Sequence, residues 1–133
     1  MLPDLPQQNK HKEAEAGIKF RHWIDKNPYM TATFEMKYAH ANNSLPFSEV
    51  KQKQIDYANA IRSDKGVLIR NRDGEGLPDY TYLRNEPSYI VVKFKKCFVF
   101  IPPDLWEIES KKSKRRSITE LRARLIGTKI IEL

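Results

Sequence analysis

Cysteine is almost absent from this sequence, since Cys97 is the only one among 133 residues. A disulfide within the chain is therefore excluded, and the apolar run around Cys97 predicts a small buried side chain. One cysteine and three histidines also argue against a zinc cage built from these residue types within one chain.

Long apolar runs are missing as well. No segment approaches the roughly 20 apolar residues that a membrane helix needs. Residues 1–10 are polar, carry two prolines and lack the apolar stretch of a signal peptide. These absences, together with the cysteine usage, lead us to expect a reducing, intracellular compartment.

Basic residues are in excess, with 24 Lys and Arg against 17 Asp and Glu and a formal net charge of +7. Such a charge attracts polyanions, of which nucleic acid is the commonest partner, although simple solubility is the alternative explanation. A hydrophobic content of 40% is ordinary for a folded chain. The length predicts a loose arm over residues 1–10 and one domain over residues 11–133.

Hydrophobic periodicity predicts the elements of this domain. A helix is expected over 12–27, ending before Pro28, and a second helix begins at a Ser48 cap and closes near Gly66. A third helix runs from a Ser117 cap to Ile126, with Gly127 as its stop. Five strands are expected, over residues 29–39, 67–69, 80–83, 89–94 and 97–101, with loops over 42–46 and 73–76. The predicted class is α/β or α+β, with a mixed central sheet of about five strands flanked by helices.

The strand over 29–39 carries the main candidate site. Alternation places Phe34, Met36 and Tyr38 on one face and Glu35 and Lys37 on the other. Hydrolysis of a phosphodiester needs a carboxylate to hold a divalent metal and a cation near the scissile phosphate or the attacking water. Glu35 and Lys37 supply both, although an exposed strand face without function has the same pattern.

Other residues would have to complete this site. Asp79 follows Pro78 at the mouth of a strand, and Mg²⁺ takes only one or two protein carboxylates. Gln54 falls on the apolar stripe of the second helix, where it would orient water or phosphate, or bond to backbone. Glu13 adds a carboxylate on the first helix, with Glu15 as its competitor.

Cations elsewhere are candidates for contact with a DNA backbone, which carries no sequence information. The densest group lies at 111–116, and the usual state of such a charge run is a solvated loop. The candidate DNA-binding residues are Arg21, Lys51, Lys53, Arg62, Lys111, Lys112, Lys114, Arg115 and Arg116.

Taken together, these residues resemble the PD-(D/E)XK nuclease superfamily, particularly the small phage and archaeal-type Holliday junction resolvases. The resemblance spans most of residues 12–127. Its pieces are Glu13, the strand Phe34-Glu35-Met36-Lys37, the run Ser44-Leu45-Pro46-Phe47 leading to Gln54, the pair Pro78-Asp79, and the segment from Arg115 to Glu120. The order is unusual, because Pro-Asp normally precedes the acidic strand. Asp25 and Asp73 are therefore rivals of Asp79, and Val91-Val92-Lys93 lacks the acid of a standard second motif.

The resemblance implies a Mg²⁺-dependent endonuclease, with Mn²⁺ as a substitute, that resolves four-way DNA junctions in recombination. Glu35, Asp79 and Glu13 would bind the metal or its water. Lys37 would stabilise charge on the phosphate or orient the attacking water, and Gln54 would position that water or the phosphate. It also implies a homodimer, with the arm or the aromatic-rich strands as its contact, in the cytoplasm of a prokaryotic or phage-infected cell. The alternatives are a flap, end or duplex nuclease of the same superfamily and a non-catalytic nucleic-acid-binding accessory protein.

Overall fold

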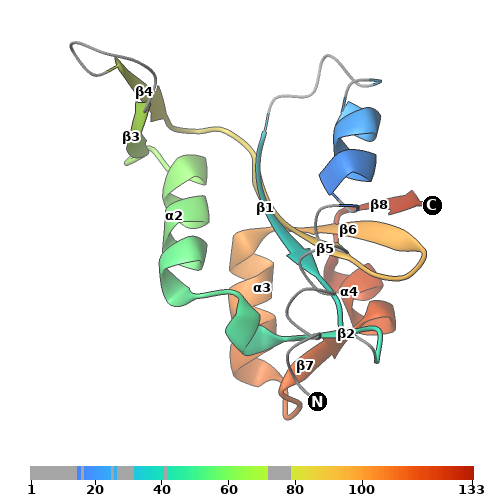
Figure 1. Ribbon diagram of the computed structural model, residues 1–133. Helices are drawn as coiled ribbons and strands as arrows, with labels where there is room; N and C mark the ends of the chain where they lie inside the picture. Colours follow the sequence, from blue (N-terminus) through green and yellow to red (C-terminus); the bar gives the residue numbers. More distant parts are fainter. Residues whose placement is uncertain (1–14, 16, 25, 27–31, 41, 72–78) are drawn as a thin grey trace, which may run out of the picture.

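The computed structural model describes residues 15, 17–24, 26, 32–40, 42–71 and 79–133. A helical segment over 17–24 comes first. The elements after it are β1 (Thr33–Tyr38), β2 (Ser44–Pro46), the 3₁₀ turn η1 (Phe47–Glu49), α2 (Gln52–Arg62), β3 (Val67–Asn71), β4 (Asp79–Leu83), β5 (Ser88–Lys93), β6 (Cys97–Ile101), α3 (Pro103–Lys112), β7 (Ser117–Thr119), α4 (Glu120–Ile126) and β8 (Lys129–Glu132) (Figure 1). The expected arm over 1–10 and turn over 73–76 lie outside the described residues. No described helix has both the length and the apolar character needed to cross a bilayer.

A mixed four-stranded sheet organises the molecule, in the order β1-β5-β6-β8. β1 runs parallel to β5, and the other two pairings are antiparallel. Two small two-stranded sheets, β2 with β7 and β3 with β4, complete the structure. The mixed α/β class is confirmed, but only three of the five expected strands enter the main sheet. β3 and β4 pair with each other instead, and the fourth place goes to β8.

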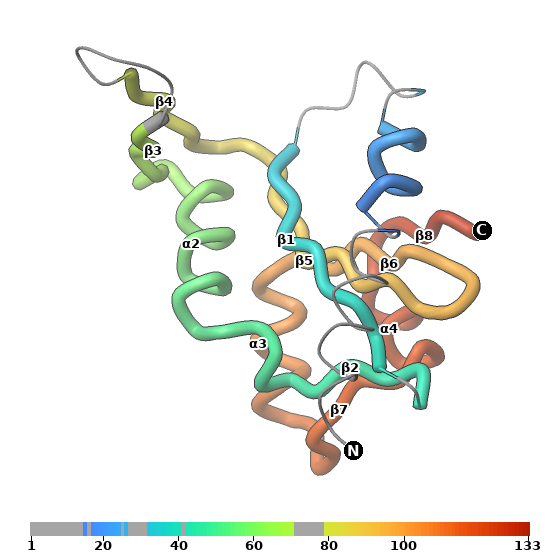
Figure 2. The backbone as a smooth tube through the Cα atoms, in the orientation of Figure 1, coloured from blue at the N-terminus to red at the C-terminus, as the bar shows by residue number. Residues whose placement is uncertain are grey.

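The two faces of this sheet are covered by different helices (Figure 2). Phe34, Met36 and Tyr38 pack with Phe20 and Trp23 of the 17–24 segment, so the alternation expected for β1 is confirmed. The aromatic rings of Phe20 and Phe34 meet edge to face, with centroids 5.0 Å apart.

The opposite face holds the larger part of the core. Val92 and Val99 of the sheet cluster there with Ile55 of α2 and Trp106 of α3, and all four are buried. Cys97, also on this face, is fully buried as expected. The side chains of β1 that alternate with Phe34 and Met36 therefore point toward the α2 side.

Three boundaries differ from the sequence prediction. α2 begins at Gln52 with Lys51 as its N-cap, so the Ser48 cap is wrong, because Phe47–Glu49 forms a separate 3₁₀ turn. Residues 44–46 are a strand, since they pair with β7. That pairing also moves the cap of the last helix from Ser117 to Thr119, whose side chain accepts from the Arg122 N–H.

One helix was not expected at all. Pro102-Pro103 follows the strand expected over 97–101, and Pro103 occupies the first turn of α3. Proline is favoured there because the first helical N–H groups have no partner within the helix and its fixed φ suits the geometry. Lys111 and Lys112 therefore end a helix rather than begin a loop.

Candidate functional site

Glu35 and Lys37 lie on the face of β1 that looks toward α2. Their register partners on β5 are Ile90 and Val92, both in the core cluster beneath that helix. The Lys37 Nζ is 3.4 Å from the Glu35 Oε1, as their spacing of two residues on a strand predicts. β1 is an edge strand of the described sheet, and the pair projects from the face of the sheet that α2 covers.

Gln54 joins the pair from α2. Its Oε1 accepts a hydrogen bond from the Lys51 backbone N–H at 2.9 Å, which satisfies one of the unpaired donors of the helix start. This leaves its amide Nε2 as a donor, and the Nε2 lies 2.8 Å from the Glu35 Oε1. We refer to Glu35, Lys37 and Gln54 as the β1–α2 cluster.

The carboxylate of this cluster is held from one side only. Both donors approach Oε1, and no partner of Oε2 is found among the described residues. The Glu35 side chain remains 36% exposed, against 19% for Lys37. A partly exposed carboxylate anchored through one oxygen can bind a cation while an ammonium group stays beside it.

Asp79 is not brought to this cluster. It is the exposed first residue of β4 and stands opposite Asn71 in the separate β3–β4 sheet. Figure 1 shows that hairpin projecting past the end of α2, away from the main sheet. The expected approach of Asp79 to Glu35 is therefore not observed, because β4 pairs with β3 rather than beside β1.

The remaining acids fall into two groups. Glu13, Asp25 and Asp73 lie outside the described residues. Glu15 is described and exposed, and its helix packs through Phe20 on the face of the sheet opposite Glu35. Within the described ranges, no three Asp, Glu, His or Cys side chains gather closely enough to hold a metal ion.

Lys93, in the run that lacks an acid, is a buried lysine on the other face of the sheet. Burial lowers its pKa, and the nearby Lys19 lowers it further. Its Nζ donates to the backbone oxygens of Phe94 and Lys95 and lies 5.7 Å from the centre of the Tyr38 ring. These contacts make Lys93 part of the fold rather than a surface cation.

The candidate DNA-binding cations are not equivalent. Arg21, Lys51 and Lys53 are exposed. Arg62 is half-buried, unlike these three. Its Nε donates to the Ser88 carbonyl at 2.8 Å, and its guanidinium lies 4.9 Å from the centre of the Tyr89 ring. Arg62 thus ties α2 to β5, and it meets the sheet because it ends the helix on the side that carries Ile61.

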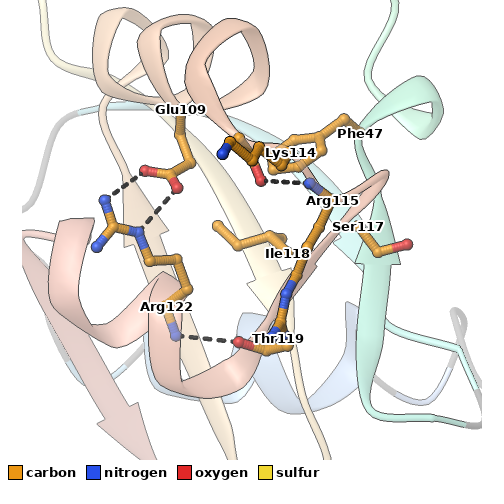
Figure 3. Close-up of a pocket in the computed structure, with 9 residues that line it drawn as sticks. Phe47, Glu109, Lys114, Arg115, Ser117, Ile118, Thr119 and Arg122 are labelled. Carbon is orange, nitrogen blue, oxygen red and sulfur yellow. Dashed lines mark hydrogen bonds and ion pairs between the residues drawn. The ribbon is translucent and has the colours of Figure 1, made fainter.

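The basic cluster at 111–116 borders a pocket of about 280 Å³ (Figure 3). Lys114 and Arg115 stand at its rim, while Phe47 and Ile118 supply apolar wall. Lys111, Lys112, Lys114, Arg115 and Arg116 are all exposed, although the Lys111 Nζ is 3.8 Å from Glu107 Oε1. This segment presents exposed cations beside a recess between α3, β7 and α4.

An ion pair in that pocket escaped sequence reasoning. The Arg122 guanidinium makes two hydrogen bonds to Glu109, at 2.8 and 2.9 Å, and so links α4 to α3 (Figure 3). The bond to Glu109 raises the pKa of Arg122. If Pro103 is taken as the start of a helix, helical spacing places Glu109 on one face of that helix, where it could meet a partner.

A second Glu, Gln and Lys combination occurs away from the sheet. Glu107 accepts from the Gln52 Nε2 at 2.9 Å and lies near Lys111. All three are on helices, at a Gln–Glu contact between α2 and α3. This group has the same three residue types as the β1–α2 cluster, but it lies between two helices rather than on the sheet.

Comparisons of the chain with models of protein families, with curated proteins and with solved structures found no match.

Proposed function

We propose that this protein is a Mg²⁺-dependent, structure-selective DNA endonuclease that resolves four-way junctions. The proposal rests on one observation, the β1–α2 cluster. There an acid on a strand is bonded to Gln54 at 2.8 Å and lies 3.4 Å from an ammonium group of the same strand. Cleavage of a phosphodiester uses this pair of charges, one to hold a metal and one to balance charge that develops on the phosphate.

The residues present are compatible with a hard divalent cation. Mg²⁺ binds through one or two carboxylates and completes its shell with waters and substrate phosphate oxygens. Glu35 offers its second oxygen, Oε2, which has no partner among the described residues, and a second acid would come from Glu13, Asp25 or Asp73. When bound, the metal would act as a Lewis acid toward the phosphate and activate water.

Each member of the cluster has a distinct role in this proposal. Glu35 holds the cation. Lys37 stabilises the charge of the phosphate or orients the attacking water from the same face of β1. Gln54 fixes the Glu35 carboxylate, and the cap bond to Lys51 in turn fixes the Gln54 amide. Gln54 is thus a positioning residue.

The wider architecture is compatible with this proposal. A mixed sheet with the acidic strand at its edge and helices on both faces is compatible with a restriction-endonuclease-like fold. The net charge of +7 and the exposed cations at 111–116 favour a polyanionic substrate. A homodimer would place two such clusters for paired cuts across a junction, in the cytoplasm of a prokaryotic or phage-infected cell.

The test is cleavage and binding of a labelled synthetic four-way junction by wild type, Glu35→Gln and Lys37→Ala. With Mg²⁺ or Mn²⁺ we expect both variants to lose at least about 100-fold in cleavage rate while binding changes little. The cleavage rate of Gln54→Ala should lie between the rates of these two variants and that of wild type, because this change misplaces the acid without removing it. Flap and linear duplex substrates measured in parallel decide between junction resolution and another nuclease of the same superfamily.

Glu107→Gln is the matched control, since it neutralises an acid that also contacts a glutamine and a lysine. Its cleavage should equal that of wild type. Retained cleavage in both Glu35→Gln and Lys37→Ala would remove these residues from the mechanism. Where Glu35→Gln abolishes cleavage, the variants Glu13→Gln, Asp25→Asn and Asp73→Asn identify the second acid, which should be the one whose substitution also abolishes cleavage.

A non-catalytic nucleic-acid-binding protein is the second candidate. It is favoured by the way Gln54 and Lys37 already satisfy one Glu35 oxygen, and by the lack of a three-acid group in the described ranges. This function predicts binding that is independent of metal and no cleavage with any divalent ion.

A further inference from the structure

The β3–β4 hairpin carries an unusual surface. It projects beyond the C-terminal end of α2, away from the main sheet (Figure 1). Its register places Leu68 opposite Tyr82 and Arg70 opposite Tyr80. Because residues directly opposite share a face, and residues two apart on a strand do too, these four side chains form one surface. We call it the tyrosine face.

All four residues of the tyrosine face are exposed. The exposed fractions are 62% for Leu68, 54% for Tyr80 and 52% for Tyr82, and Arg70 is also exposed. Contiguous apolar and aromatic side chains on a projecting element are costly to leave in water and commonly mark a binding surface.

The hairpin is held in place at its base. Gly66, between α2 and β3, has φ of +69°, and a Cβ there would lie 2.6 Å from the Leu83 carbonyl oxygen. Only glycine fits such a close approach in the left-handed region. The Tyr82 hydroxyl donates to the Lys65 carbonyl at 2.5 Å, so this ring is fixed against the base of the hairpin.

Cations accompany the rings. The Arg84 guanidinium lies 5.8 Å from the centre of the Tyr82 ring. Neither Tyr80 nor Arg70 has a side-chain partner among the residues that the structure describes. The tyrosine face therefore combines one anchored ring, one ring without a protein partner, and arginines beside both.

We propose that the tyrosine face binds unpaired bases of DNA, and this inference rests on the proposed function by naming the feature of the substrate that the protein recognises. Tyrosine rings stack on the flat faces of bases, and neighbouring arginines contact the backbone phosphates. In a paired duplex those faces are covered by the next base pair, and they become accessible at branch points and in single strands. Tyr80 and Tyr82 are about 7 Å apart along β4, twice the rise of stacked bases, so a strand lying along β4 meets both rings.

A second copy of the chain is a poorer occupant. A stable interface buries about 800 Å² and 20 to 30 residues on each partner, whereas the tyrosine face has four side chains. Two copies would also oppose arginine to arginine, while DNA brings negative charge.

The experiment measures binding by fluorescence anisotropy in EDTA, so that cleavage does not enter. The ligands are a four-way junction with an unpaired segment at its branch point, a single-stranded oligonucleotide, and a long, fully paired duplex. We expect Tyr80→Ala to weaken binding of the first two by about 5- to 100-fold and to leave the duplex affinity unchanged. Tyr80→Phe, which keeps the ring, should bind all three within about twofold of wild type.

Leu121→Ala is the control for loss of an exposed apolar side chain, because Leu121 is 72% exposed on α4. It should bind like wild type. Equal affinity of Tyr80→Ala and wild type for the single strand, or an equal loss on all three ligands, would overturn the inference. So would a change in oligomeric mass of Tyr80→Ala in sedimentation, which would assign the face to a second copy. Cleavage of junctions by wild type is measured separately with Mg²⁺. The proposed function can therefore fail while base binding by the tyrosine face is upheld, and base binding can fail while cleavage is upheld.

Discussion

Trp106 shows how a single residue of α3 balances two opposing effects. It is fully buried and meets Phe47 edge to face, with ring centroids 5.4 Å apart. Its indole Nε1 is buried and has no hydrogen-bond partner in the described part of the chain. The apolar body of the ring stabilises the core, whereas a buried donor without a partner costs about 1–3 kcal/mol.

At this scale we predict that Trp106→Ala lowers the free energy of unfolding by about 3–5 kcal/mol, because it leaves a cavity. Trp106→Phe should cost less than half of that, since it also removes the unsatisfied N–H. Urea unfolding followed by circular dichroism measures both. Equal losses in the two variants would show that the indole N–H has a partner, such as ordered water, and contributes to stability.

The catalytic proposal also depends on single residues. Sequence alternation alone predicts that Glu35 and Lys37 share a face, because the period of a strand is two. Sequence periodicity also placed Gln54 on the inner stripe of its helix, without specifying that its amide would reach Glu35. It failed for Asp79, since a favourable turn motif says nothing about which strand its own strand will pair with.

Among the elements, α4 and β8 are joined by charge. The Arg124 guanidinium makes two hydrogen bonds to the Glu132 carboxylate, and its Nε is 3.2 Å from Glu120 Oε2. The hydrogen bond from Arg124 lowers the pKa of Glu132 and raises that of Arg124. This contact fixes the last strand of the main sheet against the last helix.

The lowered pKa sets the direction of a pH effect. In the folded state Glu132 releases its proton more readily than in the unfolded state, so its contribution to stability is complete above the ordinary pKa of Glu, about 4.3. That contribution is lost as the pH falls through the lower, folded value. Wild type should therefore exceed Glu132→Gln in free energy of unfolding at pH 7, and the difference should vanish in acid.

Urea unfolding of both proteins between pH 7 and strong acid tests this expectation. Glu86→Gln, which removes a carboxyl group on the segment between β4 and β5, is the control. Its free energy of unfolding should differ little from that of wild type over the whole pH range. A difference between wild type and Glu132→Gln that grows as the pH falls would contradict the assigned ion pair.

Elements were predicted unevenly, for a physical reason. β6 was expected at its observed bounds, 97–101, because five consecutive apolar residues end at a proline. β8 was missed because it is four residues long and three of them are exposed, so it has no periodic signal. Its existence depends on pairing with β6.

For the whole molecule, net charge is the property that governs association with DNA. Each neutralised phosphate releases counterions, so log affinity falls linearly with log salt, by about 0.9 per contact. We predict that the double variant Lys114→Gln with Arg115→Gln reduces the magnitude of this slope by about 2. A salt titration of duplex binding measures it.

The matched control is Lys95→Gln with Lys96→Gln, which removes the same charge from the exposed turn between β5 and β6. Its affinity for the duplex should fall slightly because the net charge is lower, and the slope of log affinity against log salt should be unchanged. Equal slopes for the two double variants would show that Lys114 and Arg115 do not contact the DNA backbone.

Local periodicity by itself determined the mixed α/β class, the burial of Cys97 and the common face of Glu35 and Lys37, because these depend on residues a few positions apart. Tertiary structure alone decided that β1 runs beside β5, that β3 and β4 leave the main sheet, and that the Gln54 amide reaches the Glu35 carboxylate across 19 positions. Strand pairing is a competition between edges distant in sequence. It is resolved by which arrangement buries most apolar surface, and no local pattern records the outcome.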